Sequence, residues 1–173
     1  SLYLGDMPTA RKAGDVIMTF MEAQPGLDSN LYLRMNQHGS LITSFPTEAS
    51  VFHVVKRQDP NQLYFMVGYP IYYLAKLHLA TQDDTYLNTA KTIIDFCLGC
   101  HPTIYSFHFA HKVALGSALV ASITKEGKYV ELAKKITDFL LTLQDASGVF
   151  LAEADPADKY DQSAEIGVWL REI

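Results

Sequence analysis

The sequence has few cysteines, few basic residues and no long apolar segment. Two cysteines in 173 residues are too few for the disulfide framework of a small secreted domain. Lys and Arg total 14 against 19 Asp and Glu, without a basic cluster, which argues against nucleic acid as a partner. No apolar run reaches the roughly 18–20 residues that span a bilayer, and no signal sequence is recognisable. We therefore expect a cytoplasmic protein without a membrane span.

Two segments of the sequence repeat each other. Residues 81–100 align without a gap with residues 124–143. The identical positions in the first copy are Thr81, Tyr86, Ala90, Lys91, Ile93, Asp95, Phe96 and Leu98. In both copies apolar residues recur at helical spacing and the opposite face is charged, which predicts an amphipathic outer helix.

Less charged segments precede both copies, at residues 68–80 and 109–123. Their small residues allow close packing on several sides, so we expect inner helices. Residues 9–24 resemble a further outer helix, and residues 161–170 a further inner one. The composition, 49% apolar and 19% charged, is that of a soluble globular domain. We therefore predict a single all-α domain over residues 1–173, built from about three repeated α/α hairpins.

Residues 28–63 interrupt this helical pattern. The stretches LYLRMN and SLITSF flank QHGS, which predicts a β-hairpin, and residues 50–55 read as a further short strand. We expect this β-rich insertion to lie across one end of the helical array, where ligands are often bound.

The two cysteines lie in Cys97-Leu-Gly-Cys100-His101, the spacing that attaches a c-type haem. The repeat favours another interpretation, because Cys97 and Cys100 align with Leu140 and Leu143. Free cysteine behaves as a small buried apolar residue. We predict two core residues, with no metal and no cofactor. A c-type haem remains the alternative, and an absorption spectrum of exported protein would distinguish the two.

The repeated inner and outer helices resemble the α/α toroids, which include terpenoid cyclases, protein prenyltransferase β-subunits and six-hairpin glycosidases. Residues 139–150 are similar to the Q-W motif of squalene and hopene cyclases. The matching positions are Phe139, Leu140, Gln144, Gly148 and Phe150, with Phe in place of Trp. Residues 20–26, around Gln24, match the same motif more weakly. The resemblance implies that each Gln closes an outer helix and connects neighbouring turns.

The resemblance covers the repeats and departs from the cyclases at their catalytic acid. The DxDD motif of triterpene cyclases is absent, and the two aspartates in residues 81–86 are expected to cap a helix. About three hairpins are half of a closed six-hairpin toroid. We therefore expect either a homodimer or the missing remainder of a longer toroid to cover the open ends.

Toroids place their functional residues at the N-terminal ends of the inner helices, and this rule selects a set of polar side chains. The resemblance implies His111 as general acid or base, oriented by Glu165 or Asp161. The implied substrate-binding residues are Tyr69, Tyr72, His108, Lys112 and Gln162. The alternative is a hydrogen-bonded network that only joins the inner helices.

Three hypotheses for function follow. The first is an enzyme-like domain resembling terpenoid cyclases, which binds an apolar small molecule in an aromatic funnel. The second is a carbohydrate-active domain: a glycoside hydrolase, epimerase or lyase. The third is a non-catalytic helical scaffold for a protein partner. The cavity walls distinguish the first two, because a sugar needs many hydrogen-bonding side chains and an isoprenoid needs almost none.

Overall fold

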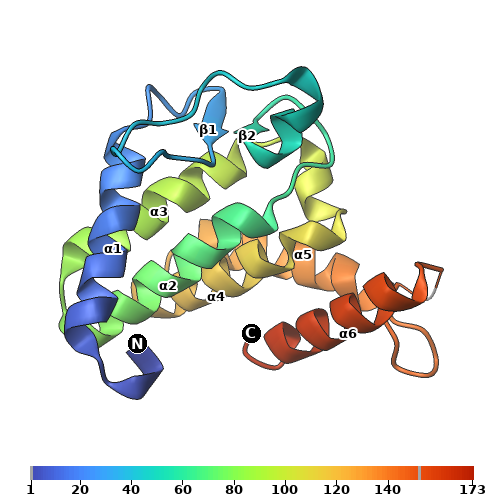
Figure 1. Cartoon of the computed structure of the whole chain (residues 1–173). Helices are drawn as coiled ribbons and strands as arrows, with labels where there is room; N and C mark the ends of the chain where they lie inside the picture. The colour runs from blue at the N-terminus through green and yellow to red at the C-terminus, as the bar shows by residue number, and fades with distance from the viewer. Residues whose placement is uncertain (1, 152) are drawn as a thin grey trace.

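The computed structural model describes residues 2–151 and 153–173. In this part of the chain the fold is all-α with a small antiparallel sheet (Figure 1). The α-helices are α1 (Met7–Glu22), α2 (Phe65–Thr81), α3 (Asp84–Leu98), α4 (His111–Thr124), α5 (Gly127–Thr142) and α6 (Pro156–Leu170). The predicted all-α class is therefore confirmed. None of the described helices is both long enough and apolar enough to cross a membrane.

The sequence repeat appears in the backbone as two matching helical hairpins. Gln82 between α2 and α3 has φ 58°, and Lys125 between α4 and α5 has φ 61°, so both connections use one residue in the left-handed region. These two residues occupy equivalent positions in the repeat. Asp83 follows as the N-cap of α3 and accepts a hydrogen bond from the Thr85 amide at 3.0 Å. The expected capping role is confirmed for Asp83, whereas Asp84 is the first residue of α3.

Helices α2 and α4 form the centre of the molecule and pack directly against each other. A Cβ atom placed on Gly68 would lie 2.6 Å from the Cβ of Lys112, and one placed on Gly116 would lie 2.7 Å from Ile71 Cγ2. The two glycines therefore set how closely the helices approach. Helix α3 packs on α2, α5 packs on α4, and α6 packs on α4. For α2 to α5 this is the predicted arrangement of inner and outer helices. The predicted inner position of α6 is wrong, because Gln162 and Ile166 are the only buried residues of this described helix.

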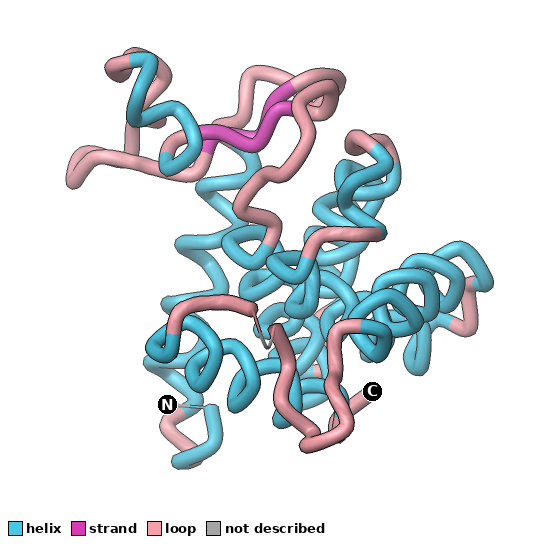
Figure 2. The backbone as a smooth tube through the Cα atoms, turned by 90° about the vertical axis from the view of Figure 1, so that its right-hand side faces the viewer, coloured by secondary structure: helices cyan, strands magenta, loops and turns pink. Residues whose placement is uncertain are grey.

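The β-rich segment lies at one end of the helices (Figures 1 and 2). Strand β1 (Asn30–Tyr32) pairs antiparallel with β2 (Val54–Lys56), with Leu31 opposite Val55. The predicted hairpin around residues 36–39 is limited to a single bridge between Met35 and Leu41. The predicted strand over residues 50–55 is wrong in its first half, because Thr47–Phe52 forms a 3-10 helix after Pro46. Only the end of that stretch reaches the sheet.

The glutamines of the Q-W-like segments each connect a helix end to the residues that follow. Gln24 accepts a hydrogen bond from the Tyr32 amide at 2.9 Å and donates to the Tyr32 carbonyl at 3.2 Å, which joins the end of α1 to β1. Gln144 donates to the Gly148 carbonyl at 3.0 Å and so closes the turn after α5. These contacts are structural, as the sequence pattern implies.

Candidate functional site

Three of the predicted site residues meet between α4 and α6. The ammonium of Lys112 donates to Glu165 Oε2 at 2.7 Å, and His111 Nε2 lies 3.2 Å from the same oxygen. The side chains of His111 and Lys112 are 1% and 5% exposed, whereas that of Glu165 is 30% exposed. Burial alone would raise the pKa of Glu165, but the hydrogen bond and charge of Lys112 hold it below its ordinary value of 4.5. Glu165 is therefore an ionised partner for a buried lysine.

The imidazole of His111 is occupied on both sides. Nδ1 donates to the His108 carbonyl oxygen at 2.7 Å, and Nε2 faces Glu165. A doubly protonated ring would satisfy both contacts, but burial lowers the pKa of His111, and the charge of Lys112 lowers it further. We therefore assign a neutral ring with its proton on Nδ1, and Lys112 as the principal partner of Glu165. His111 holds the His108 backbone and does not face solvent.

Aromatic rings surround the Lys112 ammonium. Its Nζ lies 4.3 Å from the ring centroid of Tyr69 and 5.2 Å from that of Phe65. Phe65 in turn packs edge-on against Phe109, with centroids 5.4 Å apart. These contacts favour a charged lysine inside the protein, because the face of an aromatic ring attracts a cation. The predicted residues Tyr69, Lys112, His111 and Glu165 thus belong to one cluster.

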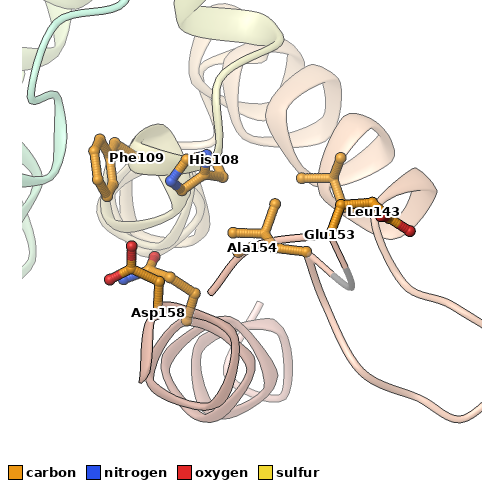
Figure 3. Close-up of a pocket in the computed structure, with 8 residues that line it drawn as sticks. His108, Phe109, Leu143, Glu153, Ala154 and Asp158 are labelled. Atoms are coloured by element: carbon orange, nitrogen blue, oxygen red, sulfur yellow. The ribbon is translucent and has the colours of Figure 1, made fainter. Parts of the chain in front are cut away.

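A cavity of about 450 Å³ lies next to this cluster, at the N-terminal ends of α4 and α6 (Figure 3). We call it the α4–α6 pocket. Its lining residues are His108, Phe109, Leu143, Leu151, Glu153, Ala154, Asp158 and Gln162. Figure 3 shows the carboxyl group of Asp158 pointing across the cavity toward the rings of His108 and Phe109. Small-molecule sites occupy about 300–1,000 Å³, and this pocket lies in that range.

Three polar side chains of the α4–α6 pocket, those of Gln162, His108 and Asp158, have an unpaired oxygen or a shifted pKa. Gln162 is 9% exposed, and its Oε1 has no hydrogen-bond partner among the described residues. Burial lowers the pKa of His108, so its imidazole is neutral at pH 7. A hydrogen bond to Asp155, together with the negative charge of Asp155, raises the pKa of Asp158. An amide oxygen that is buried without a partner costs about 1–3 kcal/mol, which a hydrogen-bond donor on a ligand would offset.

Two hydrogen bonds fix the wall of the α4–α6 pocket that leads into α6. Phe150 donates through its amide to Ser163 Oγ at 2.9 Å, and Ser163 donates back to the Phe150 carbonyl at 3.1 Å. The next residue, Leu151, lines the pocket with φ 54°, a conformation that costs energy for a side chain of this size. The segment after α5 is therefore bent sharply toward α6.

The predicted tyrosines Tyr69 and Tyr72 line a different cavity. This α1–α2 groove has a volume of about 700 Å³. Its lining residues are Leu2, Ala13, Val16, Ile17, Phe20, Met21, Leu33, Tyr69, Pro70, Tyr72, Tyr73 and Lys76. Nearly all of these side chains are apolar or aromatic. Tyr72 also packs edge-on against Trp169 of α6, with centroids 6.0 Å apart.

Asp161 does not contact His111 in the structure. Its carboxylate accepts a hydrogen bond from Gln162 Nε2 at 3.3 Å, and Asp155 is the N-cap of α6, which begins at Pro156. Glu165 alone of the two predicted acids reaches His111. Sequence reasoning missed the pocket residues Leu143, Leu151, Glu153, Ala154 and Asp158. An acidic run just before a helix is the only signal that could have drawn attention to Glu153 and Asp158.

Cys97 and Cys100 are buried free thiols within the hydrophobic core, as the repeat predicts. Burial raises the pKa of Cys100 to about 12 and that of Cys97 well above its ordinary value. His101 Nδ1 accepts a hydrogen bond from the Thr103 amide at 3.2 Å. Among the residues that the structure describes, no three His, Cys, Asp or Glu side chains are grouped to hold a metal ion.

No protein-family model, curated protein or solved structure matches this chain. The function of the chain is therefore inferred from the geometry and chemistry of its pockets.

Proposed function

We propose that the chain binds a sugar in the α4–α6 pocket and acts on it by general acid–base chemistry. The observation that carries this proposal is the composition of the pocket wall. One aromatic ring, Phe109, lies beside the hydrogen-bonding side chains of His108, Glu153, Asp158 and Gln162. A polyhydroxylated ligand would pair these groups, whereas a hydrocarbon would leave them desolvated without partners.

The protonation states of two pocket residues support the acid–base part of the proposal. His108 is neutral because burial lowers its pKa, so it can accept a proton from a sugar hydroxyl or a water. Asp158 has a raised pKa because of Asp155, so it holds a proton to higher pH than an ordinary aspartate. Two groups whose surroundings favour opposite roles are the usual basis of acid–base catalysis.

The residues that the sequence selected as catalytic receive positioning roles in this proposal. His111 holds the backbone of His108 through its 2.7 Å hydrogen bond. Asp161 accepts a hydrogen bond from the amide nitrogen of Gln162 and so fixes the orientation of this pocket-lining side chain. Glu165 fixes Lys112 beneath the aromatic rings. Hydrolysis, epimerisation and elimination on a sugar all use such an acid–base pair.

A glycan array, followed by titration calorimetry of its hits, tests sugar binding. We expect Gln162→Leu to weaken affinity about tenfold, as loss of one buried hydrogen bond implies. His108→Ala should abolish turnover and leave substantial binding, because the backbone carbonyl that His111 contacts is retained. His38→Ala, in the β-rich segment, is the matched control and should change neither. The absence of any glycan hit would refute the proposal.

The pH profile of turnover tests the roles of the two groups. We expect turnover to rise as the pH falls toward the raised pKa of Asp158, because the protonated fraction of this acid increases. It should fall again once His108 becomes protonated. Asp158→Asn should remove the rise. A profile that is unchanged by Asp158→Asn would exclude Asp158 as the acid.

A second candidate function is binding of an apolar small molecule in the α1–α2 groove, as the terpenoid-cyclase resemblance suggests. The apolar lining of this groove supports it. Val16 is 64% exposed at the groove, so Val16→Glu should block a farnesol-like ligand without unfolding the protein. Val168→Glu, at an exposed position of α6, is the control. Equal farnesol affinity in the unsubstituted protein, Val16→Glu and Val168→Glu would exclude this candidate function.

A further inference from the structure

The α4–α6 pocket offers hydrogen-bond acceptors and almost no donors. Gln162 Oε1 is a buried acceptor without a partner, and one of the two Nε2 hydrogens of the same amide is donated to Asp161. The carboxylates of Glu153 and Asp158 accept only, when ionised. Neutral His108 provides one donor at most. Within the described residues, the lining includes no Lys and no Arg. A ligand must therefore supply most of the donors.

The pocket also has a negative charge that the protein does not neutralise locally. Glu153 and Asp158 line it, Asp155 and Asp161 lie beside it on α6, and Lys159 is the only basic residue from 151 to 165. The nearby ammonium of Lys112 is already paired with Glu165 at 2.7 Å. The positive end of the α6 dipole favours acids at the start of the helix, and it explains both Asp155, whose side chain caps the helix, and Asp158 in the first turn. It does not explain Glu153, which precedes the helix.

The ring of Phe109 provides a further surface for a cation. Three neighbours hold it in place: the ring centroid of His108 is 4.2 Å away, that of Phe107 5.2 Å and that of Phe65 5.4 Å. The face of a phenyl ring carries negative charge density and attracts an ammonium group within about 6 Å. Figure 3 shows this ring and the carboxyl group of Asp158 on facing sides of the cavity.

We propose that the ligand of the α4–α6 pocket is an amino sugar, whose protonated amine lies near the Glu153 and Asp158 carboxylates and the ring of Phe109. This inference rests on the proposed sugar-binding function and specifies the substrate class. A neutral sugar gains hydrogen bonds only, whereas an ammonium group is also attracted by the two exposed carboxylates. A uronic acid adds a further negative charge beside two carboxylates, which is unfavourable at this short range.

Matched saccharides at pH 7 and low salt test the inference with the full chain. Titration calorimetry compares the glucosamine tetramer, the N-acetylglucosamine tetramer and the glucose tetramer, all β-1,4-linked. We expect the free amine form to bind at least about tenfold more tightly than the other two, and this preference to shrink at 1 M salt. Glu153→Gln and Asp158→Asn should each reduce the preference for the glucosamine tetramer over the glucose tetramer. Glu131→Gln on the exposed side of α5 is the matched control.

The outcomes separate the inference from the proposed function. Equal or tighter binding of the acetylated or glucose tetramer refutes the amino-sugar inference and leaves the sugar-binding proposal intact. Failure of every saccharide to bind refutes the proposed function itself. Ethanolamine serves as an amine without a sugar, and its binding as tightly as the glucosamine tetramer would show attraction of cations in general, which also refutes the inference.

Discussion

At the scale of single residues, the central feature is a lysine buried between two inner helices. Lys112 depends on Glu165 for its counter-ion and on Tyr69 and Phe65 for its aromatic surroundings. A buried ion pair contributes little net stability, but removal of one partner is costly because the other charge is left uncompensated. The cost therefore depends on which partner remains.

This asymmetry gives a prediction for two substitutions. Glu165→Gln leaves the buried ammonium without a carboxylate and should lower the free energy of unfolding by about 1–3 kcal/mol. Removal of one partner from a fully buried ion pair costs about 3–5 kcal/mol. The expected loss here is smaller because Glu165 is partly exposed. Lys112→Met removes the buried charge and keeps an apolar chain among the rings, so it should cost less. Urea unfolding at pH 7 measures both.

The control is an exposed ion pair on α5. Asp138→Asn separates Asp138 from Lys134, and we expect a change below about 0.5 kcal/mol because surface pairs are weak. A larger loss from Lys112→Met than from Glu165→Gln would contradict the proposed pairing.

His111 makes the stability of the fold sensitive to acid. Its pKa in the folded protein lies below the ordinary 6.5, chiefly because of burial, so the unfolded chain binds more protons in the interval between the two values. The free energy of unfolding should therefore fall as the pH drops from 7 through 6.5 toward that lower pKa. His111→Gln should make this dependence shallower, as urea unfolding over a pH series measures. His38→Gln should leave it unchanged, and an identical slope in His111→Gln would refute this assignment.

At the scale of helices, the contact between α2 and α4 depends on two glycines. Gly68→Ala and Gly116→Ala place a methyl group against Lys112 and Ile71, and each should destabilise the fold by about 1–3 kcal/mol. Gly167 on α6 has open space around its Cα, so Gly167→Ala should stabilise by about 0.5–1 kcal/mol through helix propensity alone. Thermal unfolding distinguishes the expected destabilisation from the expected stabilisation. Stabilisation by Gly68→Ala would mean that the helices are not in close contact there.

The helices could be predicted because their signals are local. The repeat and the apolar spacing located α3 and α5 closely, and they placed Cys97 in the core. The start of α6 was missed because its cap, Asp155 before Pro156, lies six residues ahead of residue 161, where the predicted apolar segment begins. The 3-10 helix over Thr47–Phe52 was missed because its apolar residues also fit a strand. Short segments of this kind are decided by tertiary contacts.

At the scale of the whole molecule, the predicted site divides into three parts. His108 and Gln162 line the α4–α6 pocket, Tyr69 and Tyr72 line the α1–α2 groove, and Lys112 with His111 and Glu165 forms the cluster between them. The sequence suggested that the N-terminal ends of inner helices come together, and the N-terminal regions of α4 and α6 line the α4–α6 pocket. It could not suggest Glu153 and Asp158, because their position depends on the bend after α5 and on the angle of α6 to α4.

The most direct test of the account is the site of sugar binding, measured by amide chemical shifts in solution. During titration with the glucosamine tetramer, we predict the largest shifts at residues 108–109 and 153–162, with no comparable change in α1 or α3. The Gln162→Leu variant should require higher concentrations for the same shifts. Changes confined to the α1–α2 groove, or the absence of any change at saturating tetramer, would contradict the assignment of the α4–α6 pocket as a sugar site.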